Sequence, residues 1–357
     1  MTPRPDLLLH LGQDKTGSTA IQRSLYGSPA ALRDAGLYFP DPGGHASHRQ
    51  IFPHLTGCLP EDPVQMKTLA KSEAAAFATA QAMWADTLRQ MQAAPPRRLI
   101  LSSETEFRSY PKAGFERLVQ TLNAVVDKVR VVAYLRSPAS FFVSRVQQDL
   151  KKRPEPSRIP PDHYRRVLAP WRDLGPGPVE VVEYRREALF QGDVIADFCQ
   201  RFLPELDRAR LADPGYSNPT LSAEAMDLLQ DFHRGEVQAP YAWYARRPQR
   251  FKNLVAQADA EVEGKTRPRL HDSLRAVIEA RTTDLDWLEG EFGLTFGDVS
   301  PPQMPRATAE ERFQTLRDVA DICPVDSARK AALWQRVQAI ARRDRSLLAR
   351  AARGFRR

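Results

Sequence analysis

The sequence predicts an α/β fold: a three-layer sandwich with a central parallel sheet flanked by helices, followed by a helical C-terminal extension. Four short apolar runs carry this prediction. They lie at residues 6–11, 98–102, 129–135 and 179–184. Each is nearly continuous in Leu, Ile and Val, which is typical of strands covered on both faces of a parallel sheet. Helical patterns separate the runs, so we expect right-handed strand–helix–strand crossovers.

The helices follow from apolar residues at helical spacing. Within the α/β part we expect them at residues 17–26, 28–35, 66–91, 113–126, 139–151 and 187–202. Residues 36–63 and the proline-dense 152–161 are expected to form loops. From residue 222 the pattern becomes all-helical, with helices at 222–233, 270–290, 308–320 and 328–352. The weakly periodic segment 240–269 is expected to be a loop over the site or a mobile segment.

Composition indicates an ordinary globular protein. The chain has 357 residues, of which 42% are hydrophobic and 27% charged. No apolar run approaches the roughly 20 residues that span a membrane, and the first residues lack a secretory signal. Three widely spaced cysteines, Cys58, Cys199 and Cys323, argue against a disulfide framework or a zinc site. They favour a reducing compartment, and we expect a cytoplasmic location.

The basic charge is concentrated at the C-terminus. Residues 328–357 hold ten Lys or Arg and one Asp, a net of +9, so the other 327 residues sum to −1 against the total of +8. Apolar residues recur there at helical intervals: Leu333, Val337, Ile340, Leu347, Leu348, Ala351 and Phe355. Such a helix could lie on an anionic membrane, making a peripheral membrane protein, or cover the core with a solvated outer face. Nucleic-acid binding is disfavoured because a recognition motif is missing.

A glycine-rich stretch, GQDKTGST at residues 12–19, follows the first predicted strand. Such a turn into a helix aims several backbone amides at one point, at the positive end of the helix dipole, and so binds a phosphate or sulfate group. Gly12 and Gly17 relax the backbone, and Lys15 reaches the anion from within the loop. The ATPase pattern GxxxxGK[ST] places its lysine after the second glycine, whereas Lys15 precedes it. The alternative is a tight strand–helix turn without a ligand.

A second group of residues follows the third predicted strand. The strand ends at Leu135 and delivers Arg136 to the carboxyl edge of the sheet, where open α/β sheets bind ligands. Pro138 starts a helix that carries Ser144, eight residues beyond the arginine. A guanidinium fork and a hydroxyl suit a second, separate phosphate. The alternative is an arginine in a structural salt bridge.

Together the two motifs resemble the sulfotransferases that use 3′-phosphoadenosine 5′-phosphosulfate (PAPS), and the opening stretch looks like their bacterial branch. Three further fragments fit: GLYFP at 36–40, LSSETEF at 101–107 and SNPTLSAEAMDLL at 217–229. The resemblance covers about residues 6–234 and implies a P-loop-like fold with PAPS as co-substrate. It implies that Lys15, Thr16, Gly17, Ser18 and Thr19 cradle the 5′-phosphosulfate. Arg136 and Ser144 would hold the 3′-phosphate.

The candidate base is Glu104, which follows the second predicted strand in LILSSETEF. Transfer to an alcohol needs a group that takes the hydroxyl proton. The resemblance gives a glutamate at this position that role, with Glu106 as its near rival; a capping or salt-bridging glutamate is the alternative. His48, from a loop that also holds His45 and His54, is the second candidate base. No metal is expected, since no Cys or carboxylate pattern accompanies these histidines.

The resemblance predicts sulfuryl transfer from PAPS to a hydroxyl or amine of a saccharide, lipid or small molecule, with Lys15 stabilising the leaving phosphate. A P-loop kinase or nucleotide hydrolase with a variant loop is one rival, although an acidic strand end for Mg²⁺ is lacking. A non-catalytic protein that binds an anionic ligand is the other. We expect residues 1–235 to form the α/β core, 236–327 a helical and loop continuation over the acceptor site, and 328–357 a basic amphipathic helix.

Overall fold

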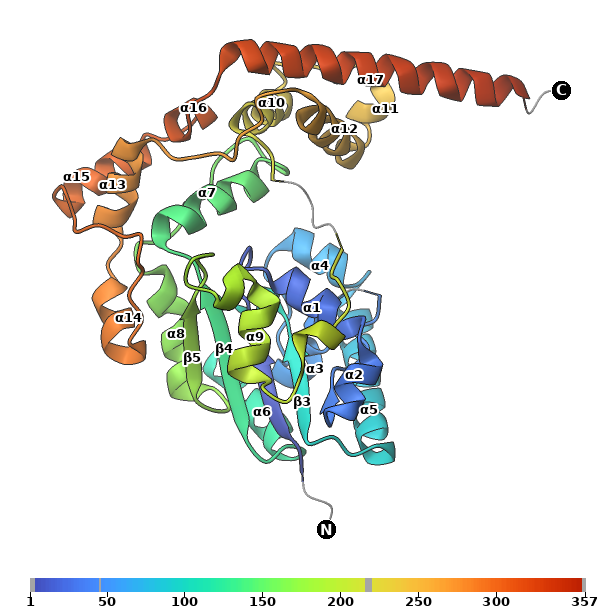
Figure 1. The fold of residues 1–357 in the computed structure, drawn as a ribbon, viewed down its shortest axis with the longest axis vertical. Helices are drawn as coiled ribbons and strands as arrows, with labels where there is room; N and C mark the ends of the chain where they lie inside the picture. Colours follow the sequence, from blue (N-terminus) through green and yellow to red (C-terminus); the bar gives the residue numbers. More distant parts are fainter. Residues whose placement is uncertain (1–3, 45, 216–219, 355–357) are drawn as a thin grey trace. The chain divides into compact units, whose positions relative to one another are not determined.

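The computed structural model describes residues 4–44, 46–215 and 220–354, and the chain forms two compact units (Figure 1). The first unit comprises Met1–Ser137, Asp162–Ser217 and Thr283–Asp298. The second comprises Pro138–Pro161, Asn218–Thr282 and Val299–Arg357. The boundary expected near residue 235 therefore falls inside the second unit, as does the helix that follows Arg136.

The first unit is built on a five-stranded parallel sheet in the order β2-β3-β1-β4-β5. Its strands are β1 (Asp6–His10), β2 (Leu37–Tyr38), β3 (Arg98–Ser102), β4 (Val129–Leu135) and β5 (Val179–Glu183). The four predicted strands are confirmed. The sequence missed β2, which has two residues and thus no readable periodicity. Because His10 pairs with Ser102 and Val132, the residues that follow the three central strands meet at one rim.

Helices cover both faces of this sheet, which confirms the three-layer prediction. The helices of the first unit are α1 (Ser18–Tyr26), α2 (Pro29–Asp34), α3 (Phe52–Thr56), α4 (Pro63–Leu69), α5 (Glu73–Ala93), α6 (Lys112–Asn123), α8 (His163–Leu174), α9 (Val194–Phe202) and α14 (Leu285–Phe292). α1, α2 and α9, which lies in front in Figure 1, share a core with Leu8, Ile100 and Val132. α6 and α8 belong to the other layer, where Phe115 packs edge-on against Trp171 at 5.2 Å between ring centres.

Several predicted helices have different bounds, and side-chain caps explain two of them. The helix predicted at 66–91 is two helices, because the Ser72 hydroxyl accepts a hydrogen bond from the Ala75 amide and starts α5 anew. The helix predicted at 187–202 begins only at Val194. There the Asp193 carboxylate accepts hydrogen bonds from two amides of the first turn, at 2.8 and 2.7 Å.

Three stretches without a helical prediction are helical. Residues 36–63, expected to form a loop, contain α3 as well as β2. α8 follows the proline-dense loop and contains Pro170, which hid its pattern. Segment 240–269, expected to be a loop or mobile, was predicted wrongly: it holds α11 (Ala242–Ala245) and α12 (Pro248–Glu261). Phe251, Leu254 and Val255 of α12 are buried. Their spacing is that of one helix face, but polar residues around them diluted the signal.

The second unit is entirely helical in its described residues, so the predicted helical C-terminal region is confirmed. Its remaining helices are α7 (Pro138–Asp149), α10 (Ala223–Arg234), α13 (Asp272–Arg281), α15 (Arg306–Gln314), α16 (Val319–Ile322) and α17 (Ser327–Gly354). The segments predicted as single helices at 270–290 and 308–320 are each split in two. Among the described residues, no helix combines the length and the apolar character that a membrane crossing requires.

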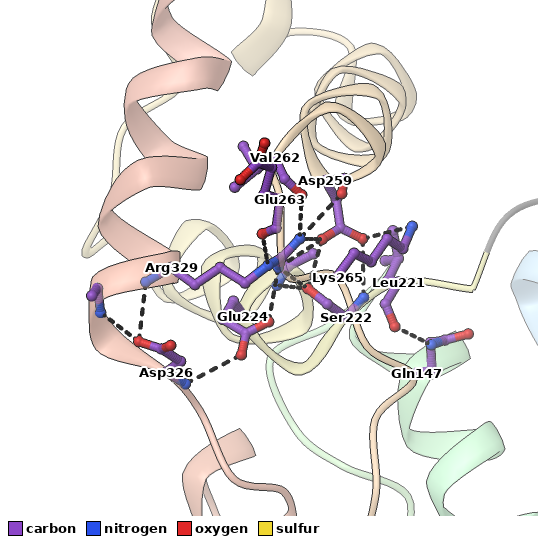
Figure 2. Close-up of polar contacts among 12 residues, drawn as sticks. Gln147, Leu221, Ser222, Glu224, Asp259, Val262, Glu263, Lys265, Asp326 and Arg329 are labelled. Carbon is purple, nitrogen blue, oxygen red and sulfur yellow. Dashed lines mark hydrogen bonds and ion pairs between the residues drawn. The ribbon is translucent and has the colours of Figure 1, made fainter.

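A buried ion cluster anchors the start of α17 to α10 and α12. Figure 2 shows the guanidinium of Arg329 among Ser222, Glu224 and Asp259. Nη1 donates to the Ser222 hydroxyl at 2.8 Å, to Glu224 at 2.9 Å and to Asp259 at 3.0 Å. Lys265 pairs with the second Asp259 oxygen at 2.9 Å. Arg329 is only 8% exposed. Each buried charge of this cluster has a partner of opposite charge, which offsets the cost of removing it from water.

The first half of α17 covers the core of the second unit. Leu333, Val337 and Ile340 are buried among residues of α10 and α12, so the covering role applies to this half. The side chains of Leu347, Leu348 and Ala351, and all of Phe355, lie outside the described residues. Membrane binding by the end of the chain stays a prediction.

Candidate active site

The loop between β1 and α1 is tied to β4 by backbone hydrogen bonds. The Gln13 amide donates to the Tyr134 carbonyl at 3.0 Å, and the Tyr134 amide donates to the Gly12 carbonyl at 2.7 Å. Gly12, Lys15 and Gly17 have positive φ values of 98°, 69° and 80°. A side chain at Gly17 would also clash, since a Cβ there would lie 2.8 Å from Val194. The loop therefore needs its glycines, and it ends at the first amides of α1, which have no intrahelical acceptor.

Two hydroxyls that were expected to contact the anion brace the loop instead. Thr16 Oγ1 donates to the Gln13 carbonyl at 2.6 Å, and Ser18 Oγ donates to the same carbonyl at 3.2 Å. Both side chains are buried, whereas Thr19 is exposed. In this arrangement the groups that can contact an anion directly are the amides of residues 17–19, the Lys15 ammonium and the Thr19 hydroxyl.

Arg136 is brought to this loop from the end of β4. Its Nε donates to the Lys15 carbonyl at 2.7 Å, and its guanidinium lies 4.8 Å from the centre of the Tyr184 ring. Its own amide donates to the Gln13 side chain at 3.2 Å, and its carbonyl accepts from the Tyr164 hydroxyl at 2.6 Å. The structure thus fixes Arg136 at the rim that carries the loop.

Lys15 and Arg136 are both half-buried at this rim of the sheet. Burial, and then the charge of Arg136, lowers the pKa of the Lys15 ammonium, while the nearby Asp14 raises it. Both causes of the lowering disfavour a cation, and a bound anion would relieve both. Such a perturbed pair at the carboxyl rim of a parallel sheet marks a candidate site for an anionic ligand.

Glu104 lies beside the loop, at the end of β3. Gly12 leaves room for it, because a Cβ on Gly12 would lie 2.9 Å from its Cα and Cβ atoms. Gln22 of α1 donates from Nε2 to Glu104 Oε2 at 2.7 Å and to the Ser102 hydroxyl at 3.2 Å. That hydroxyl also contacts Nδ1 of His10 at 2.8 Å. A buried chain of polar groups therefore holds the carboxylate of Glu104, which is itself half-buried.

Sequence reasoning missed Gln22 and His10. Gln22 is 1% exposed and lies between the buried Ile21 and Ser24 on the inner face of α1. A glutamine at a buried helix position indicates a buried hydrogen-bond partner, because its side-chain amide requires one. Since Gln22 and Glu104 are 82 residues apart, however, the sequence alone does not show which partner it finds.

Glu106, the rival carboxylate, is already engaged within the fold. It is 3% exposed and accepts hydrogen bonds from the Tyr110 hydroxyl and, at 2.9 Å, from Thr105. Arg108 pairs with it at 3.4 Å. Glu104 is thus the carboxylate that remains better placed for a substrate.

His48 is likewise engaged. Nδ1 accepts from the Ser102 amide at 2.9 Å, so Nε2 is protonated and donates to the Pro40 carbonyl at 2.9 Å. The ring is fully buried, and burial lowers its pKa to about 4. Neither nitrogen faces a substrate, which argues against His48 as a base. His54 is half-buried, and His45 lies outside the described residues.

Ser144 lies on α7, in the second unit, and is half-buried. Arg136 is the penultimate residue of the segment that ends the first unit at Ser137. The expected contact of both residues with one 3′-phosphate stays a prediction. Among residues 4–44, 46–215 and 220–354, no three His, Cys, Asp or Glu residues are grouped as metal ligands would be.

Comparison with known proteins gave one significant structural match. No family model matches the sequence, and no curated protein matches it significantly. The structure is similar to one solved as the sulfotransferase domain from the curacin biosynthetic pathway. The match covers 60% of this chain and 80% of that chain, with 16% sequence identity and a TM-score of 0.33.

Proposed function

We propose that the chain is a sulfotransferase that moves a sulfuryl group from PAPS to a hydroxyl or amine. The observation that supports this most is the meeting of Lys15 and Arg136 at one rim, at a helix N-terminus, with the Glu104 carboxylate beside the same loop. A donor with two separate anionic ends needs two cationic groups from different chain segments. The motif resemblance adds that PAPS is such a donor.

The donor would be held as follows. The amides that begin α1 and the Lys15 ammonium bind the 5′-phosphosulfate. Its negative charge offsets the repulsion between Lys15 and Arg136. Arg136, with Ser144 as its expected partner, binds the 3′-phosphate. The guanidinium is preorganised by its stacking on Tyr184 and its bond to the loop. A 3′-phosphate contact would let the protein reject ATP.

The transfer is a displacement at sulfur. The acceptor oxygen or nitrogen attacks the sulfur atom, the bond from sulfur to the bridging oxygen breaks, and adenosine 3′,5′-bisphosphate leaves. Glu104 takes the acceptor's proton, and Lys15 stabilises the charge that develops on the leaving phosphate. Most of the rate gain would come from positioning, as it does in phosphoryl transfer.

Nucleotide preference separates this proposal from the kinase alternative. Isothermal titration in metal-free buffer should show adenosine 3′,5′-bisphosphate binding at least about tenfold more tightly than ADP, one charge-assisted hydrogen bond being worth that much. Binding of ATP with Mg²⁺ in preference to the bisphosphate would favour the kinase.

Glu104→Gln separates the enzyme from a non-catalytic ligand-binding protein. This variant should bind the bisphosphate as the wild type does and lose about 100-fold or more in transfer rate, measured by mass spectrometry of acceptor panels with PAPS. If the wild type transfers nothing while binding the nucleotide tightly, the ligand-binding alternative is favoured.

A further inference from the structure

The first unit contains a small cavity. Its lining includes Thr105 and Glu106, which directly follow the candidate base, and Arg49, which directly follows His48. Since the His48 ring binds the last amide of β3, these segments converge on the rim that carries the anion-binding loop. Phe52 and Leu69 form an apolar part of the wall.

The charges of the side chains that line this cavity do not sum to zero. The lining includes two guanidinium groups, those of Arg49 and Arg108, and one carboxylate, that of Glu106. The carboxylate is committed to Arg108 and to the Tyr110 and Thr105 hydroxyls. The cavity therefore has one surplus positive charge, on Arg49.

Arg49 also has an unused donor. Its Nη2 donates to the Thr68 carbonyl at 3.2 Å, but its Nε is buried and has no hydrogen-bond partner among the described residues. A buried N–H without an acceptor costs about 1–3 kcal/mol, and more when the group is charged. Among the described residues no carboxylate forms an ion pair with this guanidinium, and a bound oxyanion would give its Nε an acceptor.

We propose that this cavity binds an anionic group of the acceptor, with Arg49 as the principal contact. The inference rests on the proposed function and narrows its acceptor to molecules that carry a carboxylate, phosphate or sulfate near the hydroxyl or amine to be modified. A guanidinium suits such oxyanions because it can donate two parallel hydrogen bonds. Phe52 and Leu69 would contact an apolar portion of the same molecule.

A selenate soak of crystals of the full chain tests this directly, because selenium scatters anomalously. We expect one peak at Lys15 and the start of α1, and a second within hydrogen-bond distance of Arg49 Nε. Arg49→Gln should remove the second peak and keep the first. Arg117→Gln is the matched control: Arg117 is exposed and bonds to the His54 carbonyl outside the cavity, so both peaks should remain.

The outcomes separate the two proposals. A peak at the loop alone overturns the cavity proposal and leaves the donor site standing. A peak at Arg49 alone supports the cavity and contradicts the donor site. A second peak that persists in Arg49→Gln is an adventitious ion only, and it overturns the cavity proposal, as does the absence of both peaks.

Solution binding identifies the group. With the donor site saturated by adenosine 3′,5′-bisphosphate, acetate, methyl phosphate and sulfate are titrated separately by calorimetry. The best of the three should bind about tenfold or more weakly to Arg49→Gln than to the wild type and to Arg117→Gln. Equal binding to all three proteins would contradict the assignment of Arg49, and thermal melting of each variant confirms that it is folded.

Discussion

Nε of Arg136 donates a hydrogen bond to the carbonyl oxygen of Lys15 at 2.7 Å, although 121 residues separate them. The bond exists because β1 and β4 are parallel neighbours, so the residues that follow each strand lie at the same rim. Lys15 adopts a positive φ of 69°, and its carbonyl is the acceptor of this bond. Two basic residues from separate segments thus meet at one rim of the sheet.

Nucleotide binding should weaken at alkaline pH because of Lys15. The protonated ammonium binds the anion, and burial together with Arg136 lowers its pKa below that of an exposed lysine. As pH rises through that lowered pKa, the charge and with it the affinity for adenosine 3′,5′-bisphosphate are lost. Calorimetry between pH 7 and pH 10 measures the loss.

Lys15→Arg is the control, since arginine keeps its charge throughout this range. Its affinity should stay level where that of the wild type falls. A wild-type affinity that does not change up to pH 10 would show that Lys15 does not hold the nucleotide through its charge.

Gln22 should act as a positioning residue for the candidate base. Gln22→Leu removes the hydrogen bond to Glu104 while keeping the size of the side chain, so kcat should fall about tenfold or more. KM for PAPS and affinity for the bisphosphate should stay within about twofold, because the loop is untouched. Gln22→Glu, which places a second carboxylate against Glu104, should lower kcat further. Parallel loss of nucleotide affinity in Gln22→Leu would indicate a merely structural role.

Acid should destabilise the fold through two buried histidines. Burial lowers the pKa of His10 to about 3 and that of His48 to about 4, against 6.5 for the unperturbed side chain. Below pH 6.5 these histidines bind protons in the unfolded chain but stay neutral in the folded chain. Their contribution to the free energy of unfolding is therefore complete above pH 6.5. As the pH falls toward the folded pKa values, the free energy of unfolding decreases by about 1.4 kcal/mol per pH unit for each histidine.

Urea unfolding at pH 7, 6 and 5 checks this slope. His48→Gln should be less stable at pH 7, since Gln cannot reproduce both bonds, but its free energy of unfolding should fall by about 1.4 kcal/mol less per pH unit than that of the wild type. A slope unchanged from that of the wild type would mean that His48 is not the titrating group.

The second unit should depend on Arg329. Arg329→Ala leaves the buried carboxylates of Glu224 and Asp259 without their main partner, and we expect a loss of about 3–5 kcal/mol in unfolding free energy. Arg336 is the control, because it lies on the same helix as Arg329 but pairs at the surface with Glu261 of α12. Its alanine variant should lose no more than about 1 kcal/mol. Urea unfolding followed by circular dichroism measures both, and equal losses would contradict the role of the cluster.

The strands and the donor loop were predictable because each is encoded by neighbouring residues. Continuous apolar runs locate β1, β3, β4 and β5, and the glycines around Lys15 define the loop locally. The two-residue β2 is too short for a pattern, and Pro170 hides α8. Gln22 and Arg49 escaped prediction for another reason. Gln22 matters through Glu104, which only the folded chain brings near, and Arg49 through the cavity that it lines.

The central claim is that Lys15 and Arg136 bind the two anionic ends of one adenosine donor, Lys15 the 5′-phosphosulfate and Arg136 the 3′-phosphate. Calorimetric titration of adenosine 3′,5′-bisphosphate into the wild type, Lys15→Met and Arg136→Met, in metal-free buffer, tests it most directly. The account predicts that each variant binds about tenfold or more weakly than the wild type, since each loses a charge-assisted contact. Wild-type affinity in either variant would contradict it.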